Sequence, residues 1–351
     1  MLTDVRCIVR SLALLAACFT LPGCGVAYVA QAAKGQVQIL NAREPITEVL
    51  EDPKAPEDLK RRLQMVRQAR AFASRELALP DNKSYTSYAD LKREYVVWNV
   101  VATPEFSVDP REWCFPIVGC VAYRGYFKEQ KANEFADKLR GEGYDTIVEG
   151  VPAYSTLGKF NDPIMSTMMS YGDDELVSTI FHELSHQVVY IADDSSFNEA
   201  FAVTVEQEGL ARWLADHGRS ADLERYRARR ARRIEALRVV TQHREQLAKL
   251  YSSGVSPEAM REGKAAEFAA LLRDLQALDA RFKVKSSLAA ALAGEPNNAR
   301  LASLATYYDC VPGFERVLEA QQHDLPRFYA AVRELAKLPR EARRERLCAA
   351  P

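Results

Sequence analysis

The stretch His182-Glu183-Leu184-Ser185-His186 contains the pattern H-E-x-x-H, which combines two metal-binding side chains with one acid–base group. On a helix, positions i and i+4 lie on one face one turn apart, so His182 and His186 can bind a single metal ion. The side chain of Glu183 leaves the helix about 100° further round the axis. This position favours a general base that acts on a metal-activated water over a third metal ligand.

A catalytic zinc ion takes three protein ligands and keeps one position for water. The next predicted helix offers two acidic residues on one face, Glu199 and Glu206. Glu199 follows a short connection after the motif, so we expect it to be the third ligand. Glu206 remains an alternative, either as the third ligand itself or as a hydrogen-bond partner of a ligand histidine.

The segment around the motif has the pattern of an amphipathic helix. Apolar residues recur at three- and four-residue steps, namely Val177, Ile180, Phe181, Leu184 and Val188. Asp173 or Asp174 is expected to cap this helix, and Ser195 or Ser196 the next one. Burying two histidines and a glutamate on such a helix without partners would cost several kcal/mol, which favours a metal site over a chance match.

A small sheet is expected before the metal-binding helix. Residues 95–101, 120–127 and 144–151 are rich in β-branched and aromatic side chains, and 128–140 has a helical pattern. This order predicts a strand–helix–strand unit. Residues 150–157 are the candidate edge against which a peptide backbone could pair, and they place Tyr154 as a substrate-binding candidate.

Helices are predicted for nearly all of the chain after Trp213. Residues 223–251 and 257–282 are expected to form a long antiparallel helical hairpin. We therefore expect an α+β, mostly helical fold in two regions. Residues 24–215 hold the sheet and the metal motif, and the helical residues 216–351 pack on the same domain.

The composition of the chain indicates the size of its core and limits the kinds of partner it can bind. With 351 residues, 48% of them hydrophobic, the chain can bury a sizeable core. Its formal net charge is −1, so no nucleic-acid partner is expected. The basic run 227–233 is flanked by acids and is interpreted as a solvated helix face. The sequence leaves the oligomeric state open.

The N-terminus has the features of a bacterial export signal. Arg6 and Arg10 are followed by an apolar run that is too short to span a membrane. It ends in Leu-Pro-Gly-Cys, which resembles a lipobox. Residues 1–23 are therefore a predicted lipoprotein signal peptide, and Cys24 is the predicted lipidation site. This implies a lipid anchor in the cell envelope that faces the periplasm, and Gly25 favours the outer membrane.

Four further cysteines are consistent with an oxidising compartment. Cys114 and Cys120 bracket a short loop with a proline and a glycine, which makes them plausible disulfide partners. Cys310 and Cys348 then pair by elimination among the three possible connectivities.

The chain resembles zinc metallopeptidases whose third ligand is a glutamate on a following helix, and more narrowly the bacterial predicted aminopeptidase lipoproteins. The resemblance rests on the motif and on several other runs, namely 113–116, 119–120, 123–127, 151–158, 198–202 and 311–315. It implies a zincin-like fold, Zn²⁺ and peptide substrates. It also suggests Tyr307 as a catalytic hydroxyl and Asn298 as a substrate contact, whereas spacing alone fits a place in the core equally well for both. Two alternatives remain: a non-catalytic envelope scaffold, and a zinc hydrolase of non-peptide amides such as cell-wall material.

Overall fold

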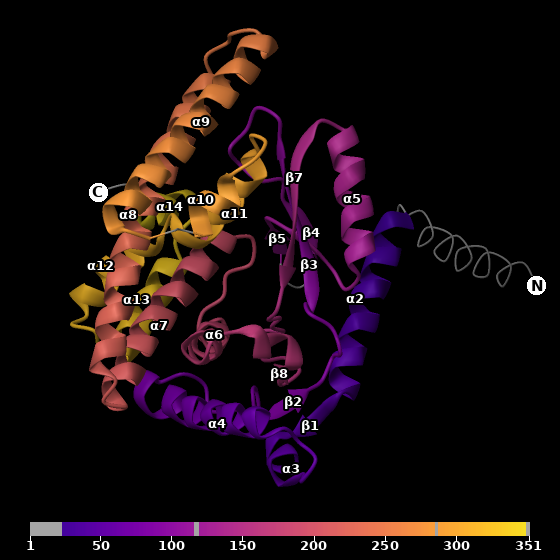
Figure 1. Cartoon of the computed structure of the whole chain (residues 1–351), viewed down its shortest axis with the longest axis vertical. Helices are drawn as coiled ribbons and strands as arrows, with labels where there is room; N and C mark the ends of the chain where they lie inside the picture. Colours follow the sequence, from indigo (N-terminus) through magenta and orange to yellow (C-terminus); the bar gives the residue numbers. More distant parts are fainter. Residues whose placement is uncertain (1–22, 116–118, 285–286, 349–351) are drawn as a thin grey trace, which may run out of the picture.

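The computed structural model describes residues 23–115, 119–284 and 287–348, and its fold is α+β and mostly helical, as the sequence predicts. Apart from Gly23, the predicted signal peptide lies outside the described residues. Helix α7 (Ser195–Asp216) packs between α6 (Asp173–Ser185) and the C-terminal helix α12 (Val311–Ala320) (Figure 1). Other elements that precede α6 are α2 (Gly23–Asn41), β1 (Arg43–Pro45), α3 (Ile46–Glu51), α4 (Glu57–Leu77), β2 (Ser87–Ala89), β8 (Ile164–Met165) and the 3₁₀-helix η1 (Ser166–Ser170).

A three-stranded sheet in the order β6-β3-β7 stands beside the metal-motif helix (Figure 1). Its strands are β3 (Val97–Pro104), β6 (Arg124–Tyr126) and β7 (Tyr144–Val151). Both outer strands are antiparallel to β3 and hence parallel to each other, and α5 (Glu129–Gly141) connects them. The expected strand–helix–strand unit is present, with β3 between its strands. Within the described residues β7 pairs with no strand other than β3, and at its outer edge the Asn297 side chain donates a hydrogen bond to the Thr146 carbonyl at 3.0 Å.

The prediction of a single strand over 120–127 is wrong. The run splits into β5 (Gly119–Val121), which pairs with β4 (Trp113–Phe115), and β6, which pairs with β3. The chain bends between them because the two halves belong to different sheets. Cys114 stands opposite Cys120 in the β4–β5 ribbon, and the two form the expected disulfide.

The main core unites segments from both ends of the chain and holds α6 and α7 at its centre. Phe181 of α6 and Phe201 of α7 are fully buried, and the ring of Phe201 lies 6.0 Å from that of Phe314 on α12. Gly209 of α7 allows a close approach, since an added Cβ would lie 2.7 Å from Leu77 and 2.8 Å from Phe181. The two helices that carry the motif and its acids are therefore rigidly held.

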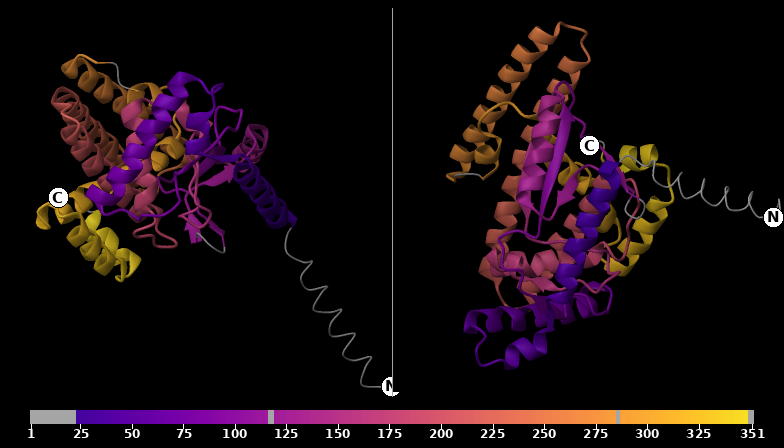
Figure 2. Two further views of the ribbon diagram at one scale, coloured as in Figure 1. Left: turned by 90° about the horizontal axis from the view of Figure 1, so that it is seen from below. Right: turned by 90° about the vertical axis from the view of Figure 1, so that its right-hand side faces the viewer.

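The predicted helical hairpin consists of α8 (Ser220–Tyr251) and α9 (Pro257–Phe282). It extends beyond the rest of the molecule (Figure 1; Figure 2, right) and has its own apolar cluster around Leu247 and Phe268. The basic run 227–233 is only partly a solvated face. Arg230 bonds to Gln207 and Glu315, and Arg233 lies over the ring of Tyr308 at 4.5 Å.

Shorter helices complete the C-terminal half: α10 (Ser287–Leu292), α11 (Asn298–Tyr308), α12, α13 (Leu325–Ala336) and α14 (Arg340–Leu347). The second expected disulfide, Cys310–Cys348, ties the start of α12 to the end of α14. In the part of the chain that the structure describes, no helix is both long and apolar enough to cross a bilayer.

Candidate metal centre

Helix α6 presents the motif and is anchored by an apolar face. The buried residues on this face are Leu176, Val177, Ile180, Phe181 and Leu184. The cap prediction is wrong: Gly172 is the N-cap, and Asp173 and Asp174 occupy the first turn. There the two carboxylates are stabilised by the positive end of the helix dipole. Asp173 forms an ion pair with Arg61, and Asp174 forms one with Arg219.

The helix ends within the motif, yet the histidines keep their helical relation. His186 is the C-cap residue, and its φ of −60° and ψ of −19° remain in the right-handed helical region. The imidazole rings of His182 and His186 consequently lie on one side of the helix, with centroids 4.9 Å apart and planes at 82°.

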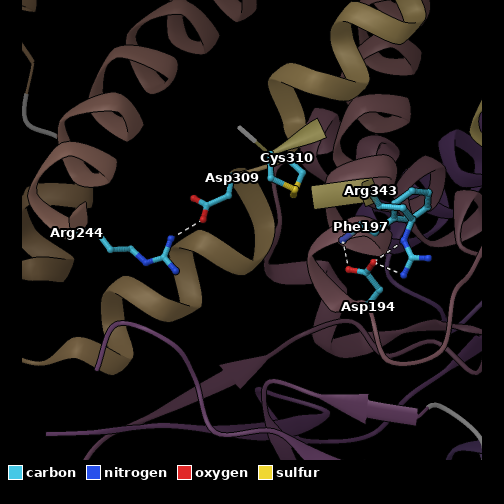
Figure 3. The surroundings of a disulfide bond; sticks show 7 residues. Asp194, Phe197, Arg244, Asp309, Cys310 and Arg343 are labelled. Atoms are coloured by element: carbon cyan, nitrogen blue, oxygen red, sulfur yellow. Dashed lines mark hydrogen bonds and ion pairs between the residues drawn. A yellow bond between two sulfur atoms is a disulfide. The ribbon is translucent and has the colours of Figure 1, made fainter. Parts of the chain in front are cut away.

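The second helix begins at a cap that the sequence did not predict. Asp194 is the N-cap of α7, in place of Ser195 or Ser196, and its carboxylate accepts a hydrogen bond from the backbone N–H of Phe197. The same carboxylate forms a buried ion pair with Arg343 of α14, at 2.6 Å (Figure 3). The C-terminal helix therefore selects the cap and holds the start of α7.

Asn198 fixes the connection between the two helices. Its amide oxygen accepts a hydrogen bond from the N–H of Ile191 at 2.8 Å, and its amide nitrogen donates to the carbonyl of the same residue at 2.7 Å. Because Asn198 is buried and doubly bonded, the next residue, Glu199, is held in the first turn of α7 and directed toward the histidines.

Three potential ligand atoms converge. Glu199 Oε2 lies 3.3 Å from His182 Nε2 and 3.8 Å from His186 Nε2, and the ligand atoms of the three residues lie within 4.8 Å of one another. Tetrahedral ligands about 2.1 Å from a zinc ion would be about 3.4 Å apart. Two imidazole nitrogens and one carboxylate oxygen at these separations form a donor set that fits zinc.

Glu206 contacts a different atom of the same histidine. Its Oε2 lies 3.1 Å from His182 Nδ1. Glu206 is about two turns further along α7 than Glu199. When the ring is neutral and Nδ1 donates to Glu206, the Nε2 lone pair of His182 is directed at the cluster. The geometry thus separates the two acids that the sequence left as alternatives: Glu199 joins the cluster, and Glu206 orients His182.

The two histidines experience opposite electrostatic environments. Burial alone would lower the pKa of His182, but its hydrogen bonds to Glu199 and Glu206 raise that pKa well above the ordinary value. Burial lowers the pKa of His186 to about 4. Burial would raise the pKa of Glu199, yet His186 and His182 hold it below its usual range. A neutral His186 and an ionised Glu199 are the forms that bind a metal ion.

Glu183 stands beside the cluster as a separate carboxylate. Burial raises the pKa of Glu183 to about 7, with His182 and the Ser155 hydroxyl opposing the rise and the charge of Glu199 adding to it. A carboxylate with a pKa near neutrality is suited to accept and return a proton. Ser155 was not predicted as a site residue, although it belongs to the run 151–158.

Two tyrosines flank the cluster from different elements. The charge of Glu199, and then burial, raises the pKa of Tyr307 on α11 well above its ordinary value. Burial and the same charge raise the pKa of Tyr123, which precedes β6. Both hydroxyls keep their protons and can donate hydrogen bonds. Tyr307 was a sequence candidate, whereas Tyr123 was treated only as a strand residue.

The expectation that Asn298 contacts substrate is wrong. Asn298 has 0% exposure, its amide donates to the carbonyl of Glu105 at 2.9 Å, and it accepts from the Tyr251 hydroxyl at 3.1 Å. It therefore joins the hairpin to the β3 end of the sheet. Tyr154 is half-buried, with its ring edge-on to Phe127 at 5.7 Å, and its role in substrate binding stays a prediction.

A family model described as "Putative aminopeptidase" matches residues 27–347, a range that includes the sheet, α6, α7 and the helical hairpin. No curated protein matches the chain, and no solved structure does so either.

Proposed function

Because the chain belongs to the "Putative aminopeptidase" family, we propose that it is a zinc-dependent peptide hydrolase of the aminopeptidase type. One observation carries the proposal: His182, His186 and Glu199 converge, while Glu183 lies beside them, is hydrogen-bonded to Ser155 and is not one of the converging groups. The three converging side chains would hold the zinc ion. We further propose that the arrangement of motif helix and sheet is zincin-like.

The proposed mechanism assigns one task to each side chain. Zinc, when bound, supplies Lewis-acid polarisation of the scissile carbonyl and lowers the pKa of water. Glu183 accepts the proton of the attacking water and passes it to the leaving amine. Tyr307 or Tyr123 donates a hydrogen bond to the oxygen that becomes negative as the carbonyl is attacked. Glu206 keeps His182 in one orientation throughout.

The edge of β7 that pairs with no other described strand offers a place for the peptide backbone after Thr146, whose carbonyl already accepts a hydrogen bond from Asn297. The expected edge 150–157 overlaps the strand only at Gly150 and Val151, because residues 152–157 leave the sheet. The Thr167 hydroxyl donates to the carbonyl of Pro152 at 2.5 Å and holds this departure. We propose that the substrate backbone pairs with the part of β7 that precedes Gly150. The substrate then runs past Ser155 toward Glu183.

The test of the proposed function combines metal analysis with a peptide screen on the soluble domain. We expect about one zinc ion per chain, and a drop in hydrolysis of at least about 100-fold on chelation that added Zn²⁺ reverses. Metal analysis of the protein measures the zinc content, and mass spectrometry of a peptide library before and after chelation measures hydrolysis. Peptide hydrolysis that is insensitive to chelation contradicts the zinc mechanism. A zinc-loaded protein that cleaves purified cell-wall fragments and no peptide contradicts the peptidase proposal.

We also propose that the protein is a lipoprotein of the bacterial envelope, anchored through Cys24 and facing the periplasm. Two disulfides within the described residues support an oxidising compartment. The signal segment itself lies outside the described residues, so the proposal depends on its sequence.

Replacing Cys24 by alanine is expected to abolish lipidation and release the protein from the detergent-soluble membrane pool. The reason is that the thiol is the proposed attachment point of the lipid. Intact mass and membrane fractionation measure the change, and Cys18→Ala serves as a control in the same signal segment. A lipid mass that persists on the Cys24 variant rules out the proposed anchor.

A further inference from the structure

A cavity of about 500 Å³ lies along the outer edge of β7, outside the proposed metal centre. Its walls come from three elements: residues 146–149 of β7, Arg140 of α5, and the α10–α11 segment with Arg300 and Ser303. Figure 1 shows α11 beside β7, opposite the side covered by α5. The cavity is open to solvent and large enough for a peptide residue and its backbone.

Glu149 is the acidic residue of this cavity. Within the described residues, it forms no ion pair, and its one hydrogen bond is received from the Ser303 hydroxyl at 3.1 Å. Arg300 is nearby, but its guanidinium donates to the backbone carbonyls of Ala291 and Ala293. Arg140 likewise donates to Thr146 and pairs with Asp137. A carboxylate in a cavity is thus left free to bind an added cation.

Desolvation raises the pKa of Glu149, against the hydrogen bond from Ser303 and the charge of Arg300, although the residue as a whole is exposed to solvent. A bound ammonium group would stabilise the ionised carboxylate. The rest of the lining includes the apolar residues Ile147, Leu292 and Leu304. The cavity consequently combines one carboxylate with an apolar wall and with two arginines that have other partners.

Both main walls of the cavity lead to the metal centre. On α11, Tyr307 lies four residues after Ser303, which is about 6 Å along the helix. After Glu149, the chain of β7 continues to Ser155, the residue beside Glu183. The hydroxyl of Tyr307 is influenced by the charges of both Glu199 and Glu149. Both walls are therefore continuous along the chain with residues beside the cluster.

We propose that this cavity binds the amino-terminal residue of the substrate, with Glu149 receiving its ammonium group and the apolar wall receiving its side chain. The proposal rests on the proposed function and specifies its substrate class: peptides with a free amino terminus and an apolar first residue. Ser303 orients the carboxylate. Arg300 and Arg140, held by other partners, leave the anion available.

The test compares a leucyl p-nitroanilide substrate series with its N-acetylated counterparts in wild-type protein and in Glu149→Gln. Glutamine keeps the shape of the side chain, and its amide oxygen can still accept a hydrogen bond from the Ser303 hydroxyl, so only the negative charge is lost. We expect kcat/KM for free amines to fall about 10- to 100-fold, mainly through KM, because a charge-assisted hydrogen bond is removed. Rates on acetylated substrates and zinc content should stay unchanged. The length of the released fragment reports how many residues separate Glu149 from the reacting bond.

Glu142→Gln is the matched control, since Glu142 is an exposed acid in the α5–β7 connection that pairs with Arg111 and Lys138. Calorimetric binding of leucinamide and of N-acetyl-leucinamide gives a readout that needs no activity. If leucinamide binding is lost in Glu149→Gln and kept in Glu142→Gln, the proposed amino-terminus site is supported. If the protein also hydrolyses no peptide, the proposed function fails while this binding site stands. Active wild-type protein with an equally active Glu149→Gln, or wild-type protein that prefers acetylated substrates, overturns the inference alone.

Discussion

Alanine at His182 or at His186 is expected to weaken zinc binding by more than about 100-fold and to abolish peptide hydrolysis. The reason is that a catalytic zinc site has only three protein ligands, so one substitution removes a third of them. Even substitutions of groups that merely orient a ligand cost about 10- to 100-fold in metal affinity. His182 Nε2 and His186 Nε2 lie 3.3 and 3.8 Å from the same carboxylate oxygen of Glu199, so each substitution removes one of the three converging ligand atoms.

Zinc content after dialysis and competition with a fluorescent chelator measure this loss. His323→Ala is the matched control, because His323 is exposed and lies outside the cluster, bonded to Glu208. The unfolding temperature of each zinc-free variant separates a lost ligand from a lost fold. If both His182→Ala and His186→Ala retain wild-type zinc affinity, the metal centre is not where we propose it.

Glutamine at Glu183 is expected to lower the hydrolysis rate by about 10²- to 10⁴-fold while zinc stays bound. The amide keeps the size of the side chain but cannot accept the proton, and loss of a general base has an effect of this size. The three converging ligand atoms are untouched, since Glu183 is not one of them. The reduction should appear in kcat, because proton transfer belongs to the reaction step.

Glu199→Gln is the contrasting variant, because it removes the charged member of the cluster. Its zinc affinity should fall, and excess zinc should restore part of its activity, whereas no zinc concentration should restore Glu183→Gln. Zinc titration and hydrolysis rates on both variants provide the comparison. The assignments of base and ligand are reversed if Glu183→Gln loses zinc and Glu199→Gln keeps it. A wild-type rate in Glu183→Gln excludes the mechanism.

Local pattern was sufficient wherever one short stretch decides the structure. The strand Tyr144–Val151 and the helix Pro257–Phe282 have the predicted bounds, since both have clear periodicity and strong boundary residues. The i, i+4 relation of the two histidines also follows from helical geometry alone. The aminopeptidase family that the sequence resembles is confirmed by the match over residues 27–347.

Predictions from the sequence were wrong where residues distant in the chain choose between local alternatives. Asp194, Ser195 and Ser196 are all good caps, and the choice of Asp194 coincides with its ion pair to Arg343, 149 residues away. The run 120–127 has uniform strand propensity, but its halves have different partners. Asn298 is polar and was assigned to the site, yet tertiary packing buries it against Glu105 and Tyr251.

The sequence by itself determined the residue types of the candidate centre, the helix that carries His182, Glu183 and His186, and the presence of two acids on the next helix. Only the tertiary structure distinguished the two acids, because they share a helix face: Glu199 lies near Nε2 of both histidines, whereas Glu206 contacts Nδ1 of His182. It also brought Ser155, Tyr123 and Tyr307 around the cluster from three separate elements. Helical spacing is a local property of the backbone, whereas the distance between side chains on different elements depends on how the whole core packs.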